Sequence, residues 1–139
     1  MSLYVLDSSV AVKWALPEIG AAKALAFRDD VRNKIHEIIA PDVFPSEVAH
    51  ALTKAERMKV IPIGDAKRHL LAILTAGPDL HPYIPLLTRA VDISSATRIA
   101  ITDCIFVALA EREGCELLTA DDKLMKNLPN YPIVSLSSL

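Results

Sequence analysis

The sequence predicts an α/β fold: a single domain, residues 1–139, in which a mostly parallel central sheet is flanked by helices on both faces. Short apolar runs of strand length alternate along the chain with longer amphipathic stretches of helix length, and strands connected through helices pair in parallel. A chain of 139 residues, 52% of them hydrophobic, is long enough to build one core without a second domain. The sequence contains no repeats, low-complexity tracts or linkers.

The first half of the chain is predicted to contain two strands and four helices. Its first apolar run stops abruptly at Asp7, as a short buried strand does before a turn, and Pro17 ends the helix that follows. Asp42 is the expected N-cap of the third helix, and Pro45 lies in its first turn, where a missing N–H costs nothing. The predicted elements are, in order, a strand at 3–6, helices at 10–16 and 19–34, a strand at 37–41, and helices at 43–59 and 63–76.

The second half is predicted to contain an extended segment, three helices and two strands. The stretch from Thr102 to Gly114 is apolar nearly all round until its last turn, which is typical of a buried helix, and Gly114 is its expected C′ residue. Thr119 is the expected N-cap of the last helix. The predicted elements are, in order, an extended segment at 80–85, a helix from 86 that ends within 94–97, a helix at 102–113, a strand at 115–119, a helix at 120–128 and a strand at 132–136.

Charge, cysteine content and hydropathy exclude several classes of protein. The formal net charge is −2, so the broad basic surface of a general nucleic-acid binder is missing, and any attraction to RNA must be local or metal-mediated. Cys104 and Cys115 lack metal-ligand spacing and are expected to be reduced core residues. No apolar run approaches the roughly 18 residues of a membrane span. Because Asp7 and Lys13 interrupt any signal-peptide core, a cytoplasmic location is expected.

Four of the seventeen acidic residues occupy positions other than a solvated helix face. Asp7 and Asp121 follow predicted strands, Asp103 lies in the first turn of the buried helix, and Glu47 lies close to the apolar face of its helix. Taken singly, each has a simple structural explanation. The aspartates are at positions that favour turn and helix-start residues, and Glu47 is placed where it would form half of an ion pair.

Taken together, these acids predict a metal site, because the carboxyl ends of parallel strands meet at one edge of a sheet. Carboxylates gathered at one edge repel each other and take up protons unless a cation neutralises them. A hard divalent ion such as Mg²⁺ or Mn²⁺ suits ligands that are all oxygen atoms. Phosphate is then the expected substrate, because such an ion polarises a phosphoryl oxygen and lowers the pKa of an attacking water.

Four segments of the chain resemble, in order and spacing, the motifs of PIN-domain ribonucleases, especially the VapC-type toxins of bacterial and archaeal toxin–antitoxin pairs. They are VLDSSVAVKWALPE, PSEVAHAL, ITDCIFVALAEREG and LLTADDKL, and they span nearly the whole chain. The resemblance implies a small α/β fold, Mg²⁺- or Mn²⁺-dependent endonucleolytic cleavage of RNA, a homodimer, and inhibition by a cognate antitoxin. The stretch before Asp103, DISSATRIAI, departs from the family's pattern. That departure leaves the start of the helix open, but not the position of the acid.

The resemblance also implies roles for individual residues. By position, the acids that match the family's acidic quartet are Asp7, Glu47, Asp103 and Asp121. Asp7 and Asp103 are the first choices as metal ligands, whereas Glu47 and Asp121 would hold a second ion, a bound water or outer contacts. Ser9 and Thr119 match small hydroxyl positions near the acids, although each position is more typical of a cap or turn residue. Asp122 is an alternative to Asp121, but the spacing of Asp121 from Thr119 favours Asp121.

The mechanism implied is in-line attack of an ion-activated water on the phosphodiester, which leaves a 5′-phosphate and a 3′-hydroxyl. It needs no histidine or lysine as acid or base, and the four histidines form no cluster. A second class of function is a PIN-fold module that binds RNA or a partner protein without cutting. A receiver-like phosphoacceptor is disfavoured because Asp7 stands alone after its strand, and a phosphatase of the DxD type because Ser9 occupies the second acidic position.

Overall fold

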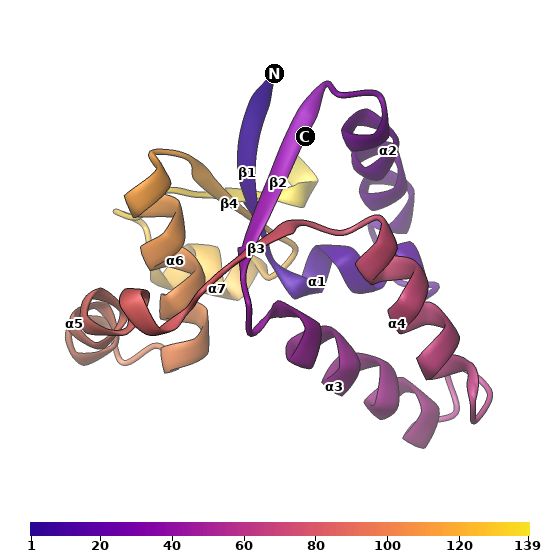
Figure 1. The fold of residues 1–139 in the computed structure, drawn as a ribbon. Coiled ribbons are helices and arrows are strands. Elements are labelled where there is room, and N and C mark those ends of the chain that lie inside the picture. The colour runs from indigo at the N-terminus through magenta and orange to yellow at the C-terminus, as the bar shows by residue number, and fades with distance from the viewer.

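A five-stranded, all-parallel sheet forms the centre of this computed structural model, which describes residues 1–139 (Figure 1). The strand order is β3-β2-β1-β4-β5, so the first strand of the chain is the middle strand of the sheet. Each neighbouring pair runs in parallel, which confirms the predicted α/β class. The strands are β1 (Ser2–Leu6), β2 (His36–Pro41), β3 (Asp79–His81), β4 (Glu116–Thr119) and β5 (Ile133–Ser135).

Helices cover both faces of this sheet. Figure 1 shows α6, with α5 outside it, on one side of the sheet and α2 on the other, while α3 and α4 extend from the lower end, next to α1. Three short 3₁₀ segments add to these helices. The helices are α1 (Ser8–Ala11), α2 (Ala21–Arg32), α3 (Phe44–Arg57), α4 (Asp65–Thr75), α5 (Leu87–Thr97), α6 (Ile101–Glu113) and α7 (Asp122–Asn127).

The sheet reverses its direction of growth between β1 and β4. From β1 the chain adds β2 and β3 on one side, and then returns to add β4 and β5 on the other. Such a reversal is the point at which open parallel sheets bind ligands, because the connections on either side of it diverge and leave a crevice at the carboxyl ends of the strands. Asp7 lies at this point, and its backbone N–H donates to the carbonyl oxygen of Leu118 in β4 at 3.0 Å.

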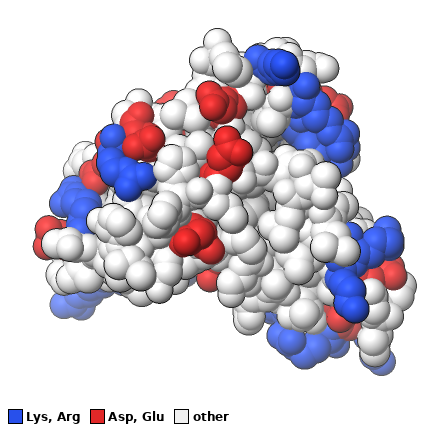
Figure 2. All heavy atoms as spheres, viewed as in Figure 1, with Lys and Arg blue, Asp and Glu red and all other residues white.

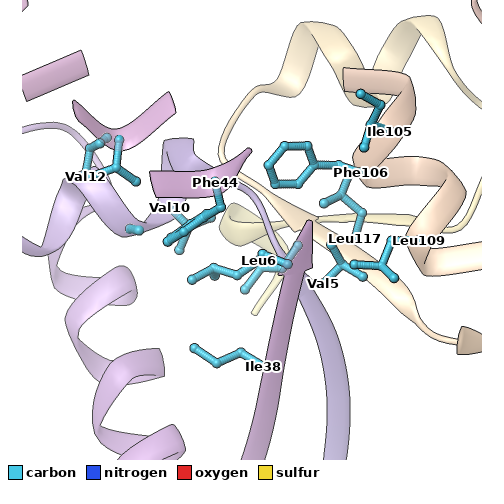
Figure 3. Packing of buried hydrophobic residues seen from close by; sticks show 14 of the residues in the cluster. Val5, Leu6, Val10, Val12, Ile38, Phe44, Ile105, Phe106, Leu109 and Leu117 are labelled. Carbon is cyan, nitrogen blue, oxygen red and sulfur yellow. The ribbon is translucent and has the colours of Figure 1, made fainter. Parts of the chain in front are cut away.

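The core lies between the sheet and the helices that cover it. Figure 3 shows side chains from β1, β4, α1, α3 and α6 converging there, including Leu6, Phe44, Phe106 and Leu117. Every residue of α6 from 104 to 110 is buried, which agrees with the prediction of a helix that is apolar all round. Gly114 ends α6 with a φ of 65°, the left-handed conformation expected of a C′ glycine.

Both predicted N-caps are wrong, because tertiary contacts engage the two side chains differently. The side chain of Asp42 accepts a hydrogen bond from the backbone N–H of Tyr83 at 3.0 Å and so holds the segment after β3, while the N-cap position of α3 is Val43. Thr119 is the last residue of β4, and Asp121 caps α7 by accepting from the N–H of Leu124. Pro45 does lie at the start of α3 as predicted.

The helix predicted at 10–16 is shorter than expected, and the two cysteines are free, as predicted. The helix expected at 10–16 is a single α-helical turn, α1, followed by a 3₁₀ turn at Val12–Trp14, because the chain must turn back within a few residues to start α2. Cys104 is buried and Cys115 half-buried, and both are free thiols. No single helix is long and apolar enough to span a membrane, and only the bent pair Ile84–Thr97 and Ile101–Glu113 reaches that length and composition together.

Candidate active site

Asp7 ends the middle strand of the sheet and is one of the few buried polar residues, with 8% of its surface exposed. The strand places it there because Val5 and Leu6, which precede it, are fully buried in the core, and α1 starts directly after it. A carboxylate at this depth loses most of its hydration. Burial accordingly raises the pKa of Asp7 above its ordinary value.

Two hydroxyl groups converge on one oxygen of this carboxylate. The Ser9 hydroxyl donates to Oδ2 of Asp7, and the Thr119 hydroxyl donates to the same atom at 2.9 Å. Each hydroxyl in turn accepts a backbone N–H, Ser9 from Ala120 and Thr119 from Asp121, both at 3.0 Å. Each hydroxyl therefore uses one lone pair to accept an amide N–H and its single proton to bond to Asp7. No side chain donates to Oδ1, while the backbone N–H of Ser8 also bonds to this carboxylate.

Asp103 lies in the first turn of α6, where its side chain is half-buried. Its pKa is raised from 3.8 to about 6, first by burial and then by the negative charges of Asp7, Asp121 and Glu47. The fold therefore brings all four predicted acids into one electrostatic environment, although they come from separate segments of the chain. The charge of Asp121 also raises the pKa of Asp7, which the two hydroxyl donors partly offset.

Glu47 and Asp121 complete this group of four carboxylates, which we call the acidic edge. Glu47 is half-buried in the first turn of α3. Asp121 is exposed, and its side chain accepts the N–H of Leu124. The neighbouring Asp122 accepts the Ser135 hydroxyl at 2.8 Å instead. The charge of Asp121, and not that of Asp122, contributes to the raised pKa values of Asp7 and Asp103.

The acidic edge has no basic partner. None of the ion pairs in the chain includes any of its four carboxylates, so the ion pair expected for Glu47 does not form. Figure 2 shows acidic side chains over the middle of the face and at the notch between the α5–α6 and α3–α4 lobes, while basic side chains gather toward the edges. The charge at the acidic edge is thus uncompensated by the protein itself.

The donor set fits a hard divalent cation by its chemistry. All its ligand atoms are carboxylate or hydroxyl oxygens, which Mg²⁺ and Mn²⁺ prefer, and the charge of the group is what such an ion would neutralise. The side chains are not gathered tightly: no group of three or more His, Cys, Asp or Glu residues lies close enough to hold one ion jointly. The match between these residues and a divalent cation therefore depends on the chemistry of their oxygen atoms and on their uncompensated negative charge.

Sequence reasoning identified the four acids but not the hydrogen bonds that hold Asp7. Ser9 and Thr119 were expected to act as cap or turn residues, whereas the structure directs both hydroxyls at one carboxylate oxygen. The signal that points to them is spacing. Each hydroxyl lies two residues from an acid, in the sequences Asp7-Ser-Ser9 and Thr119-Ala-Asp121, so each is carried to the same strand end as that acid.

The raised pKa of Asp103 predicts how stability depends on pH. Because the folded state holds this proton more tightly than the unfolded chain, whose carboxyl has a pKa near 3.8, stability should fall as pH rises from about 4 to about 6 and then level off. Asp103→Asn removes that cost. Allowing for the solvent that reaches this side chain, we expect a gain of about 1 kcal/mol in unfolding free energy at pH 7 and none at pH 4.

Urea unfolding in a chelating buffer at the two pH values measures this gain. Asp92→Asn, the same change on an exposed position of α5, is the matched control and should leave stability unchanged at both. A loss of stability in Asp103→Asn that is equal at pH 4 and pH 7 would show that Asp103 is not under electrostatic strain.

Comparison with known proteins identifies the family. The PIN domain family matches residues 4–129, a range that includes the whole acidic edge. No curated protein sequence matches the chain. Among solved structures, PAE2754 from Pyrobaculum aerophilum has a TM-score of 0.73 at 18% identity, covering 99% of this chain and 92% of that one.

Two solved toxin–antitoxin complexes also share the fold. One is from Klebsiella pneumoniae, with a TM-score of 0.62, 17% identity and coverage of 96% of this chain and 97% of that one. The other is VapBC2 from Rickettsia felis bound to a DNA fragment from their promoter, with a TM-score of 0.65, 16% identity and coverage of 96% and 98%. At these identities the likeness shows the fold alone. Together with the family match over most of its length, it establishes that this chain belongs to the PIN-domain family.

Proposed function

We propose that the protein is a metal-dependent endoribonuclease that hydrolyses RNA phosphodiester bonds with Mg²⁺ or Mn²⁺, and that it is the toxin of a VapBC-type toxin–antitoxin pair. The observation that carries this proposal is the acidic edge itself. Four carboxylates share one electrostatic environment at the point where the sheet reverses, and none of them has a basic partner. The negative charges of the other three raise the pKa of Asp103. An arrangement of this kind is costly for stability and suits a site that holds cations.

The four acids and the two hydroxyl residues would have different roles in binding the ion. Asp7 and Asp103 would hold the ion, while Glu47 and Asp121 would hold a second ion or a water. A bound divalent cation would polarise the phosphoryl oxygen and lower the pKa of the attacking water. Ser9 and Thr119 act through Asp7: they fix the orientation of its carboxylate and favour its ionised form.

The same proposal includes two protein partners, a cognate antitoxin and a second copy of the chain. Support for the antitoxin comes from the two toxin–antitoxin complexes that share the fold. Support for both comes from the large apolar side chains that remain exposed, since a protein interface would remove them from water. The most exposed of them include Ile19, Ile63, Ile84, Met58 and Leu71.

An RNA cleavage assay with and without the metal tests the enzymatic part. We expect the purified chain to shorten RNA in Mg²⁺ or Mn²⁺, to stop when the ions are chelated, and to resume when Mn²⁺ is restored, because the acidic edge is repulsive without a cation. The products should carry 5′-phosphate and 3′-hydroxyl ends. A chelator-insensitive activity would contradict the proposal.

A second candidate function, a PIN-domain module that binds RNA or protein without cutting, is favoured by one observation. No three metal-ligating side chains lie close enough to hold an ion jointly. The same assay separates the two functions. In Mn²⁺, a binder would shift the mobility of the RNA in a native gel and leave its length unchanged in a denaturing gel.

A further inference from the structure

A pocket of about 430 Å³ adjoins the acidic edge, between the start of α2 and the end of β5. Its wall includes Ala120 and Asp122, the residues on either side of Asp121, together with Lys13, Lys23 and Leu136. Its volume lies within the range of clefts that hold small ligands. An RNA chain held at Asp121 would therefore have this pocket directly beside it.

The charge that this pocket offers a ligand is that of Lys23. The ammonium group of Lys13 donates to the carbonyl oxygen of Ile19 at 2.8 Å and lies 3.4 Å from a carboxylate oxygen of Glu18, so an acid balances it. Lys23 donates only to the neutral carbonyl oxygen of Ser137, at 2.6 Å, and belongs to no ion pair. The one acid in the pocket wall, Asp122, accepts the hydroxyl of Ser135.

Apolar surface lies next to this free charge. Ile19 lines the pocket and is 97% exposed, while Leu136, which also lines it, is buried. Gly20 between them has a φ of 87°, which a side chain would strain, so the chain turns here and α2 begins at the pocket. A ligand that satisfies both features has an anionic group for Lys23 and a flat apolar face for Ile19. A nucleotide has both.

We propose that this pocket binds the RNA nucleotide next to the scissile phosphate, with its own phosphate at Lys23 and its base or ribose against Ile19. The proposal depends on the proposed function for the identity of the nucleic acid. An acidic protein segment would also complement Lys23. The two pocket residues that flank Asp121 in the sequence favour RNA, because a strand that reaches the acidic edge continues past it and its next phosphate is attracted to a lysine that forms no ion pair.

Lys23→Gln tests the pocket, because it removes the charge and keeps an N–H donor for the carbonyl of Ser137. The full chain should also carry Asp103→Asn, so that bound RNA stays intact. We expect the Kd for a fluorescent single-stranded RNA to rise about 3- to 10-fold, and the slope of log Kd against log salt to fall by about one, as the loss of one phosphate contact predicts. Lys67→Gln, an exposed lysine of α4, is the matched control and should change neither quantity.

The outcomes distinguish a failure of the pocket assignment from a failure of the proposed function. If Lys23→Gln, with an unfolding curve like that of its parent, binds RNA as tightly as Lys67→Gln does, the pocket assignment is overturned whether or not the protein cuts RNA. If binding depends on Lys23 and the protein with its native acids never cleaves, the pocket stands and the endonuclease proposal fails. Competition by a polyglutamate peptide but not by adenosine 5′-monophosphate would also overturn the assignment, in favour of an acidic protein ligand.

Discussion

Asp7→Asn and Asp103→Asn should each lower the rate of RNA cleavage by more than about 100-fold, because loss of a direct metal ligand should exceed the roughly 10- to 100-fold effect of losing an outer contact. Asparagine keeps the shape of aspartate and removes the charge. At position 7 its carbonyl oxygen can still accept the hydroxyl protons of Ser9 and Thr119, so the fold should persist. The measurement is single-turnover cleavage of a labelled RNA in saturating Mg²⁺ or Mn²⁺.

One control variant and a test of folding make this result interpretable. Asp92→Asn makes the same change on the exposed surface of α5, outside the acidic edge and the pocket, and should retain most of the activity. Circular dichroism and thermal unfolding should show that the two inactive variants stay folded. Full activity in both Asp7→Asn and Asp103→Asn would remove the acidic edge from the mechanism.

Phe44→Ala should lower the free energy of unfolding by about 3–5 kcal/mol, the range observed for large aromatic side chains removed from cores. Phe44 is fully buried at the start of α3, and Figure 3 shows it near Val10 and Leu6. Its ring therefore helps to fix the end of the helix that carries Glu47 against the strand that carries Asp7. Urea unfolding monitored by circular dichroism measures the change.

Ile84→Ala is the matched control, because Ile84 is 67% exposed and its truncation should alter stability by no more than about 0.5 kcal/mol. Phe44→Leu should fall between the two, since it keeps part of the volume. A loss in Phe44→Ala as small as that in Ile84→Ala would mean that this part of the core is not tightly packed.

The elements that could be predicted from the sequence are those whose pattern is local. Burial requires apolar residues in α6, β1 and β4. Each of these elements can therefore be recognised in the sequence as an apolar run. The strand β3 has no apolar run, because its three residues are half-exposed or exposed. It is a strand only because β2 pairs with it and because Asp42 holds the segment that follows it.

In the candidate site, too, local features could be predicted from the sequence and long-range contacts could not. Position relative to strand ends and helix starts was enough to select Asp7, Glu47, Asp103 and Asp121 from the other acids. The partners of those acids could not be predicted, because hydrogen bonds such as that between Thr119 and Asp7 join residues 112 positions apart. The role of Asp121 as the cap of α7 was likewise assigned to the wrong residue, Thr119, since the exact end of β4 decides which side chain faces the helix.

The hydrogen bonds that Ser9 and Thr119 donate to Asp7 also determine when the site can form during protein synthesis. Asp7 leaves the ribosome long before its partner Thr119, because 112 positions separate the two residues. A nascent chain that ends before β4 has the first acid but neither the second hydroxyl nor Asp121. This centre can therefore assemble only after β4 and Asp121 have been synthesised, and products truncated before β4 would lack it.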